Sequence, residues 1–314
     1  MTRAAPANGH LAGAMEKPAA AGPHRSLWGD VWRQFRRHKG ALTGLAVLGL
    51  VVAACTAGPW VYWHDPFASD LAARNLGMSL GHPFGTDNVG RDTLARVLIG
   101  GRISLAVGLA AMLLGVLIGT LVGVMSGFFK TLDGALMRLT DMFLALPLLP
   151  LLLVTIMLFR DSLRDMLGPE AGVFLMIVFV IGATSWMQTA RVVRGEVLAV
   201  KAREFVVAAA SIGTRRRNVV LRHILPNVMS PVMVSASLGV ATAIITESAL
   251  SFLGLGFPSD FPTWGRLLFD GQNAIELTPA RVIWPGIMIS VTVLSVNFIG
   301  DGLRDALDPK QRGR

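Results

Sequence analysis

Six long stretches without an acidic or basic residue constrain the fold of this 314-residue chain more than any other feature. Each stretch is long enough to cross about 30 Å of hydrocarbon as a helix. Strands that span a membrane alternate in polarity, and these stretches do not. The sequence therefore predicts an all-α membrane protein with six transmembrane helices, at 41–63, 103–129, 142–159, 171–190, 224–246 and 282–300.

Composition agrees with this fold class, since only 16% of the residues are charged, against roughly a quarter in soluble domains. The net charge is +9, but the basic residues lie mostly between the apolar stretches, which is typical of topology signals and disfavours nucleic-acid binding. The single cysteine, Cys55, excludes an intrachain disulfide, and the six histidines lack metal-ligand spacing. The sequence thus predicts no metal site.

The distribution of Lys and Arg predicts the orientation. The N-terminal segment and every second gap after it carry 21 of the 29 basic residues, and the alternate gaps carry the other 8. Cytoplasmic segments are enriched in Lys and Arg. We therefore expect a multi-pass protein of the inner membrane with both termini and the loop 191–223 in the cytoplasm.

The regions outside the spans have distinct compositions. Residues 1–24, rich in Ala, Pro and Gly, are typical of a disordered tail. Residues 25–40 place Trp28, Val31, Trp32 and Phe35 at helical spacing, which predicts an interfacial amphipathic helix. A basic membrane flank without a helix is an equally good interpretation. Residues 64–100 are expected outside the cytoplasm, and 302–314 form a cytoplasmic tail.

Glycine recurs at every fourth position of the second span, which leaves a stripe without side chains along that helix. Such a stripe allows close approach of a neighbouring helix, so we expect helix packing in this chain or against a partner permease. A role in a substrate path is the alternative. The residues are Gly115, Gly119, Gly123 and Gly127.

The loop before the fifth span reads REFVVAAASIGTRRRNVVLRHILPN from residue 203. Its alanines favour a helix, Gly213 offers a stop, and a second helical stretch leads into the span. A topology signal needs charge but not such an ordered loop. We therefore expect helix, glycine turn and helix beneath the membrane, with small residues that leave room for a partner.

This loop resembles the cytoplasmic "EAA" loop of permease subunits in ATP-binding-cassette (ABC) importers. That pattern has a glutamate, two alanines, a glycine three residues later, and then Ile-Leu-Pro. The leading glutamate falls on Val207, a departure from the pattern, although Glu204 lies one turn earlier. The matching positions are Ala208, Ala209, Gly213, Ile224, Leu225 and Pro226.

A second segment narrows the resemblance. HPFGTDNVGRDTLARVLIGGRISL, from His82, is similar to the segment before the second span of dipeptide, oligopeptide and nickel permeases, and the later segments from Glu247 and Gly300 resemble the same subfamily. The match fits its "C"-type subunit and implies a type-1 permease domain over 101–301. The motif positions are Gly85, Thr86, Asp87, Gly90, Arg91 and Asp92.

The resemblance implies half of a permease pair with a cytoplasmic coupling helix. Expected partners are a second permease subunit, two cytoplasmic ATPases, an extracytoplasmic binding protein and membrane lipid. No GxxxxGK[ST] loop occurs in the sequence. ATP is accordingly expected at the ATPases, with no cofactor and no catalytic residue in this chain.

Several alternatives remain at this point. Peptides are the first expectation for the substrate, and nickel or another small solute is the second. An ion-coupled secondary transporter usually has ionisable residues within its spans and repeated halves, neither of which is found here. A membrane enzyme would need a clustered catalytic constellation. A passive scaffold is the last alternative.

Four further residues carry expectations. Asp87 and Arg91, at i and i+4, predict an ion pair on a short helix. A role of these residues and Asp92 at the outer mouth, or in contact with the binding protein, is the alternative. Trp264 is expected at the membrane interface, with substrate contact as the alternative. Glu247, just after the fifth span, is expected to pair with an arginine of this or the partner subunit, and a functional carboxylate at membrane depth is the alternative.

Overall fold

The computed structural model describes residues 27–307, without the side chains of residues 27, 28 and 30, so the predicted tail 1–24 and most of 302–314 lie outside the described residues. Within that range the chain is helical and contains no strand, only one isolated bridge between Thr86 and Asp92. The helices are α1 (Leu27–Arg37), α2 (Lys39–Val61), α3 (Thr93–Phe128), α4 (Lys130–Ala145), α5 (Leu148–Leu167), α6 (Pro169–Lys201), α7 (Glu204–Ser211), α8 (Arg216–Val219), α9 (Leu225–Phe252), α10 (Trp264–Gly271) and α11 (Ala280–Leu307), with short helices at Leu71–Ala73, Val220–Ile224 and Gln272–Ala274.

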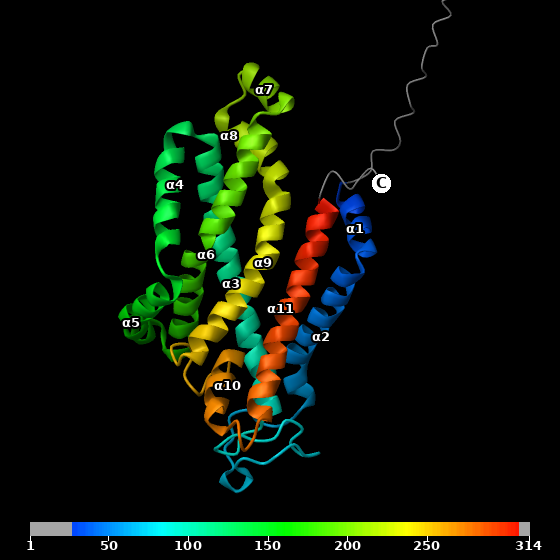
Figure 1. The fold of residues 1–314 in the computed structure, drawn as a ribbon, viewed down its shortest axis with the longest axis vertical. Coiled ribbons are helices and arrows are strands. Elements are labelled where there is room, and N and C mark those ends of the chain that lie inside the picture. The colour runs from blue at the N-terminus through cyan, green and yellow to red at the C-terminus, as the bar shows by residue number, and fades with distance from the viewer. Residues whose placement is uncertain (1–26, 308–314) are drawn as a thin grey trace, which may run out of the picture.

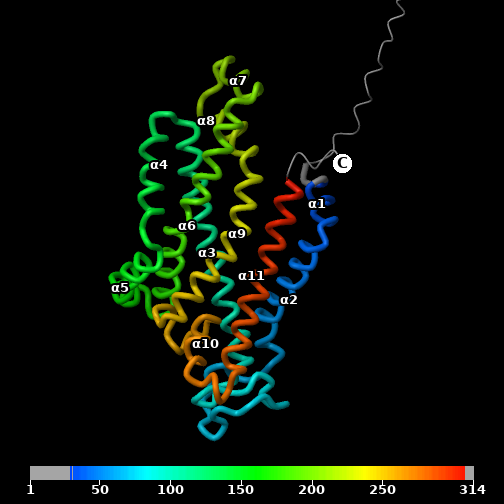
Figure 2. The backbone as a smooth tube through the Cα atoms, in the orientation of Figure 1, coloured from blue at the N-terminus to red at the C-terminus, as the bar shows by residue number. Residues whose placement is uncertain are grey.

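The long helices form an elongated bundle (Figure 1). Helix α3 packs most extensively along α6 and also along α9, while α11 packs against α2 and α9. Helices α1 and α7 and the end of α11 lie at one end of the bundle, while the segment between α2 and α3 forms a cap at the other end together with α10 (Figure 2). The two candidate functional regions, the loop around α7 and the 62–92 segment, therefore lie at opposite ends.

Five helices of the described range are long and apolar enough to cross a membrane: α2, α3, α6, α11 and the continuous stretch that ends with α9. This agrees with five of the six predicted spans. Helix α3 has 36 residues and is therefore roughly 54 Å long. It begins ten residues before the predicted span, so two arginines, Arg96 and Arg102, lie on its first turns.

The third predicted span, 142–159, is not one straight helix. It is divided between α4 and α5, which meet at an angle of 90°. The two helices are long and apolar enough to cross a membrane only when they are taken together. The break falls at Leu146 and Pro147, and Pro147 is the residue that caps the start of α5. Proline cannot donate a backbone hydrogen bond and disfavours helix at the residue before it. The 90° break therefore corrects the single helix predicted at 142–159.

The glycine stripe of α3 lies against α6. A Cβ atom added at Gly119 would lie 2.6 Å from the carbonyl oxygen of Trp186, and one at Gly123 would lie 2.7 Å from that of Ala190. At Gly115 and Gly127 the nearest atoms belong to Ser185 and Val197, at 2.9 and 2.8 Å. The four residues are buried, and the missing side chains allow α3 and α6 to form the most extensive contact of the bundle.

Helix α1 forms within the predicted range 25–40, and part of its apolar face packs inside the protein. Its apolar residues Val31 and Phe35 are 8% and 5% exposed and pack with Ala306 and Leu307 at the end of α11. Only Trp32 among the described aromatic residues of this helix is substantially exposed. This part of the apolar face is therefore covered by the protein itself, which anchors the N-terminal helix to the C-terminal one.

Candidate functional site

The loop after α6 folds as helix, glycine turn and helix. Helix α7 ends in a glycine cap: the N–H of Gly213 donates to the carbonyl of Ala210, and the N–H of Thr214 donates to that of Ala209. This pair of bonds requires a left-handed residue after the helix. Gly213 has φ = +82°, and the space around it is open. Backbone conformation, not lack of space, therefore requires glycine here.

Helix α7 presents one buried and one exposed face. Val206 and Ala209 are 3% and 8% exposed, and Val206 packs in a cluster with Val200, Val219 and Ile224. On the other face Phe205 is 43%, Val207 52% and Ile212 83% exposed. Ala208 is exposed beside them. We call Phe205, Val207, Ala208 and Ile212 the α7 surface.

The matched loop positions therefore divide between two places. Ala208 and Glu204 are exposed, but Ala209 faces inward and supports the helix. Ile224 is fully buried in the same cluster, while Leu225 and Pro226 open α9. Val220–Ile224 is a π-helical turn, a feature that is frequent at functional sites.

The motif before α3 builds a compact turn. Gly85 and Gly90 have φ of +75° and +83°, and a Cβ atom at Gly90 would lie 1.7 Å from the carbonyl oxygen of Asp70. Thr86 is fully buried; its hydroxyl donates to the carbonyl of Ala73 at 2.5 Å and accepts from the N–H of Leu76 at 2.8 Å. Only glycine fits the two left-handed positions without strain.

Asp87 is the acceptor at the centre of this turn. Its Oδ2 accepts from Arg91 Nε at 2.7 Å and from Arg96 Nη1 at 2.6 Å, and its Oδ1 accepts from the N–H groups of Val89 and Arg91. Burial acts to raise the pKa of Asp87, but these hydrogen bonds and the Arg96 charge outweigh it and hold the pKa below its ordinary value of 3.8. The predicted pair of Asp87 and Arg91 is present, but in a turn and not on a helix.

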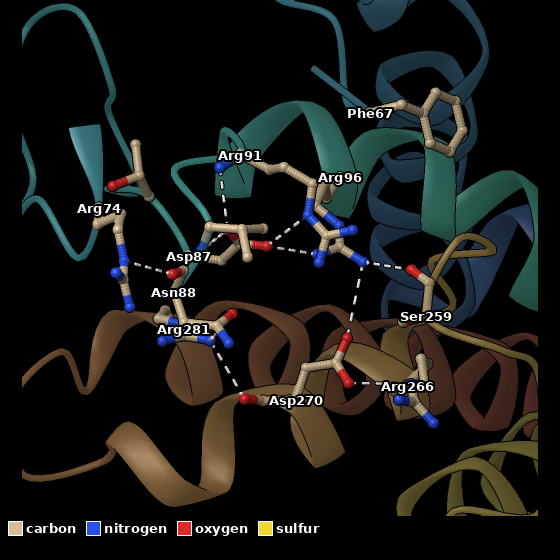
Figure 3. Close-up of polar contacts among 12 residues, drawn as sticks. Phe67, Arg74, Asp87, Asn88, Arg91, Arg96, Ser259, Arg266, Asp270 and Arg281 are labelled. Atoms are coloured by element: carbon tan, nitrogen blue, oxygen red, sulfur yellow. Dashed lines mark hydrogen bonds and ion pairs between the residues drawn. The ribbon is translucent and has the colours of Figure 1, made fainter. Parts of the chain in front are cut away.

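Arg96 extends this ion pair into the bundle (Figure 3). It is 2% exposed; its Nη2 donates to the Ser259 carbonyl at 2.9 Å and lies 3.6 Å from the Asp270 carboxylate. Asp270 pairs in turn with Arg266 at 2.9 Å. The arginine therefore joins the turn before α3 to the segment around α10.

Arg281 closes the same network from α11 (Figure 3). It is 4% exposed and donates to the side-chain oxygens of Asn75 and Asn88 and to the carbonyl of Asp270, at 3.2 to 3.4 Å. The sequence did not identify Arg96, Asp270 or Arg281, because their partners lie far away along the chain. The only local sign of these three residues in the sequence is that they are charged and lie near the ends of apolar stretches. We call Asp87, Arg91, Arg96, Asp270 and Arg281 the outer ion network.

Two expectations for buried residues are wrong. Glu247 is fully buried, and its partners are hydroxyl groups: Ser104 donates at 3.1 Å and Ser251 at 2.8 Å, with no arginine in contact among the described residues. Trp264 is also fully buried; its indole N–H donates to the Val97 carbonyl at 3.0 Å. It packs α10 against α3 and is not an interface anchor.

A recess of about 410 Å³ opens between the α4–α5 break, α6 and α9. Its lining is mostly apolar, but hydroxyl and amide side chains lie among the apolar ones within helices long enough to span a membrane. In such helices, polar side chains usually contact another helix or line a cavity. The polar lining residues are Thr184, Ser185, Gln188, Thr189, Ser235, Thr242 and Thr246.

Comparison with known families gives two matches that together cover almost the whole chain. Residues 92–313 match the family described as binding-protein-dependent transport system inner membrane component. Residues 26–77 match the N-terminal transmembrane domain of oligopeptide transport permease C.

Relatives that match over most of their length are named as permease proteins of peptide transport systems. The oligopeptide transport system permease protein OppC of Salmonella typhimurium is 43% identical over 92% of this chain and 93% of its own length. OppC of Haemophilus influenzae is 41% identical over 92% and 90%. The dipeptide transport system permease protein DppC of Bacillus subtilis is 36% identical over 92% and 88%.

A solved structure supports the fold alone. A chain of the MetNI methionine ABC transporter, in inward facing conformations, matches with a TM-score of 0.54 at 17% identity. The match covers 67% of this chain and 94% of the other.

Proposed function

This chain belongs to the binding-protein-dependent transport system inner membrane components, and from that premise we propose that it is a permease subunit of an ATP-driven importer of di- or oligopeptides. One observation carries the proposal: oligopeptide permeases match over 92% of the chain, including the N-terminal region before the shared permease domain. Nickel or another small solute is the alternative cargo.

The partners follow from the family. We propose that the chain pairs with a second permease subunit, and that two ATPases bind from the cytoplasm and a binding protein from the outside. The α7 surface supports the position of the ATPase contact, since it exposes Phe205, Val207 and Ile212 on a helix that projects from the end of the bundle. Exposed apolar groups at one site mark a protein contact. ATP is consumed by the ATPases, and this chain performs no catalysis.

Coupling would use the rigidity of the loop. The buried face of α7 packs on the same valine cluster as α6 and the start of α9. A push on α7 would therefore reach α6 and α9, two of the helices that line the recess described above. We propose that this recess forms part of the peptide pathway, where hydroxyl and amide groups can bind peptide backbone without regard to its side chains. Rigid-body movement of helices is an established kind of switching.

The same proposal places α7 and both termini in the cytoplasm and the 62–92 segment outside. Attachment of a membrane-impermeant maleimide tests this orientation. In a Cys55→Ala background, Leu80→Cys should react in intact spheroplasts, because Leu80 is fully exposed. Ile212→Cys should react only after the membrane is opened. Labelling in the opposite order would contradict the orientation.

Uptake by cells tests the function and its cargo. Cells that lack this gene should lose uptake of radiolabelled tripeptide and regain it with the wild-type gene, while ⁶³Ni²⁺ uptake stays unchanged. Loss of nickel uptake with normal peptide uptake would favour the alternative cargo. Normal uptake of both, in a strain without other peptide importers, would contradict the proposal.

A further inference from the structure

Three side chains with metal-binding atoms converge where α2 ends and α3 begins. These are His64, His82 and Asp92, and one ligand atom from each lies within 4.8 Å of the other two. His64 is exposed, His82 is half-buried and Asp92 is buried. Within the described range this is the one such group of three. It lies apart from the α7 surface, at the opposite end of the bundle.

The carboxylate of this group is already held in position. Asp92 Oδ1 accepts from the N–H of Ala95 at the start of α3, at 2.8 Å. Its Oδ2 accepts from the Tyr62 hydroxyl and lies next to His82 Nδ1, each at 2.8 Å. Hydrogen bonds from surrounding groups orient the ligands of most metal sites in this way. Asp92 is thus fixed before any ion arrives.

The third side chain is placed by stacking. The ring of His64 stacks on Tyr62, with centroids 4.5 Å apart, and meets the edge of the His82 ring at 5.4 Å. A hydrogen bond between His82 and Asp92 explains the position of those two residues without a metal. That hydrogen bond does not explain why the imidazole of His64, just after α2, also lies close to His82 and Asp92.

We propose that His64, His82 and Asp92 bind a borderline divalent transition-metal ion, with Zn²⁺ as the best match. Two imidazole nitrogens and one carboxylate oxygen are a common protein donor set for zinc. Magnesium and calcium prefer oxygen ligands alone. Zinc bonds of about 2.0 to 2.2 Å need closer ligands than those seen here; His64, exposed on the loop after α2, moves inward to complete the site. Water occupies the fourth position.

The site would tie the first span to the permease domain. His64 follows α2, whereas Asp92 caps α3. A bound ion therefore links these two helices at the end of the bundle that holds the outer ion network. An ion that binds only the folded state stabilises it by RT ln(1 + c/Kd), where c is the free ion concentration, so the chain should melt at a higher temperature when zinc is present above its Kd. This inference does not depend on the transported cargo.

Zinc titration of the purified full-length protein tests the site. The protein carries a tag without histidine and is stripped with a chelator, and binding is followed by calorimetry and by metal analysis after dialysis. The wild type should bind one Zn²⁺ and show no response to Mg²⁺. His64→Ala should bind at least about tenfold more weakly. His223→Ala, a matched control in the loop before α9, should bind like the wild type.

Two outcomes would overturn the inference. One is equal zinc affinity in the wild type and His64→Ala, which would place the ion elsewhere. The other is no binding to the wild type at micromolar zinc, which would leave only a histidine–aspartate hydrogen bond. Co²⁺ provides a second readout, since its visible spectrum in the wild type should show nitrogen ligation that His64→Ala lacks. His64 is exposed, so its replacement should not impair folding.

Discussion

At the residue scale, Asp87 is the central hydrogen-bond acceptor of the outer ion network. It accepts from two arginines and two backbone N–H groups, and one of the arginines is almost completely buried. A buried ion pair is costly to break because the remaining charge loses its partner. Asp87 should therefore be replaceable only at a large loss of stability.

Asp87→Asn tests this directly. Removal of the charge leaves Arg96 buried without its closest counter-charge, and we expect a loss of about 3 kcal/mol in the free energy of unfolding. Thermal unfolding of the purified protein should show a midpoint several degrees lower. Asp161→Asn, on the exposed side of α5, should change it little. Equal midpoints for the two variants would contradict a stabilising outer ion network.

The lowered pKa of Asp87 also predicts a pH dependence. Since its pKa is lower in the folded state than its ordinary 3.8, the carboxylate stabilises the fold at higher pH. That contribution is lost as pH falls through the folded-state pKa. The difference in unfolding midpoint between the wild type and Asp87→Asn should hold above about pH 4 and shrink below it. A difference that stayed constant in acid would exclude Asp87 as the titrating group.

At the element scale, the two glycine-dependent features differ in physical cause. The stripe on α3 needs glycine because α6 is too close for a side chain, whereas Gly213 needs it because of its positive φ. Substitutions can separate these causes. The first concerns helix packing and stability, and the second concerns the shape of the loop beneath the bundle.

Gly119→Ala tests the packing. Its Cβ would lie 2.6 Å from the backbone oxygen of Trp186, so α3 and α6 must separate. Such overpacking should destabilise the protein by about 1–3 kcal/mol, read as a lower unfolding midpoint. Gly195→Ala is the matched control, because no atom lies within 4 Å of its added Cβ. An equal effect of both changes would show that the contact is not tight.

Gly213→Val tests the loop. A β-branched residue at φ = +82° is strained, which should tilt or unravel the end of α7. We expect the number of peptides imported per ATP hydrolysed to fall several-fold in the assembled transporter. Gly213→Asn should keep most of this ratio, since asparagine tolerates the left-handed conformation. Wild-type coupling in the valine variant would remove the proposed role of α7.

The sequence predicted the elements better than their contacts. Apolar runs reveal spanning helices because a helix in lipid needs apolar side chains along its whole length. In the same way, Gly213 predicted the turn after α7. The angle of the break at Pro147 could not be predicted from the sequence, because leucines and prolines continue the apolar run across it. The hydroxyl partners of Glu247, and the meeting of His64 with His82, depend on contacts between distant segments. No local pattern contains such contacts.

At the scale of the whole molecule, the chain is a bundle with two specialised ends. One end exposes apolar side chains on a helix, and the other is held together by the outer ion network (Figure 3). Between them lies a recess with polar groups in its wall. This division is what a half-permease needs if force arrives at one end while cargo arrives at the other.

Transport in reconstituted vesicles tests most directly whether this chain is one half of the permease of an ATP-driven importer. The chain is incorporated alone or with its sister permease and ATPases, with binding protein and labelled peptide on the outer side of the permease and ATP on the ATPase side. The account predicts import only in the full assembly with ATP, unchanged when ion gradients are dissipated. Import by the chain alone, or import by the full assembly driven by an ion gradient without ATP, would contradict it.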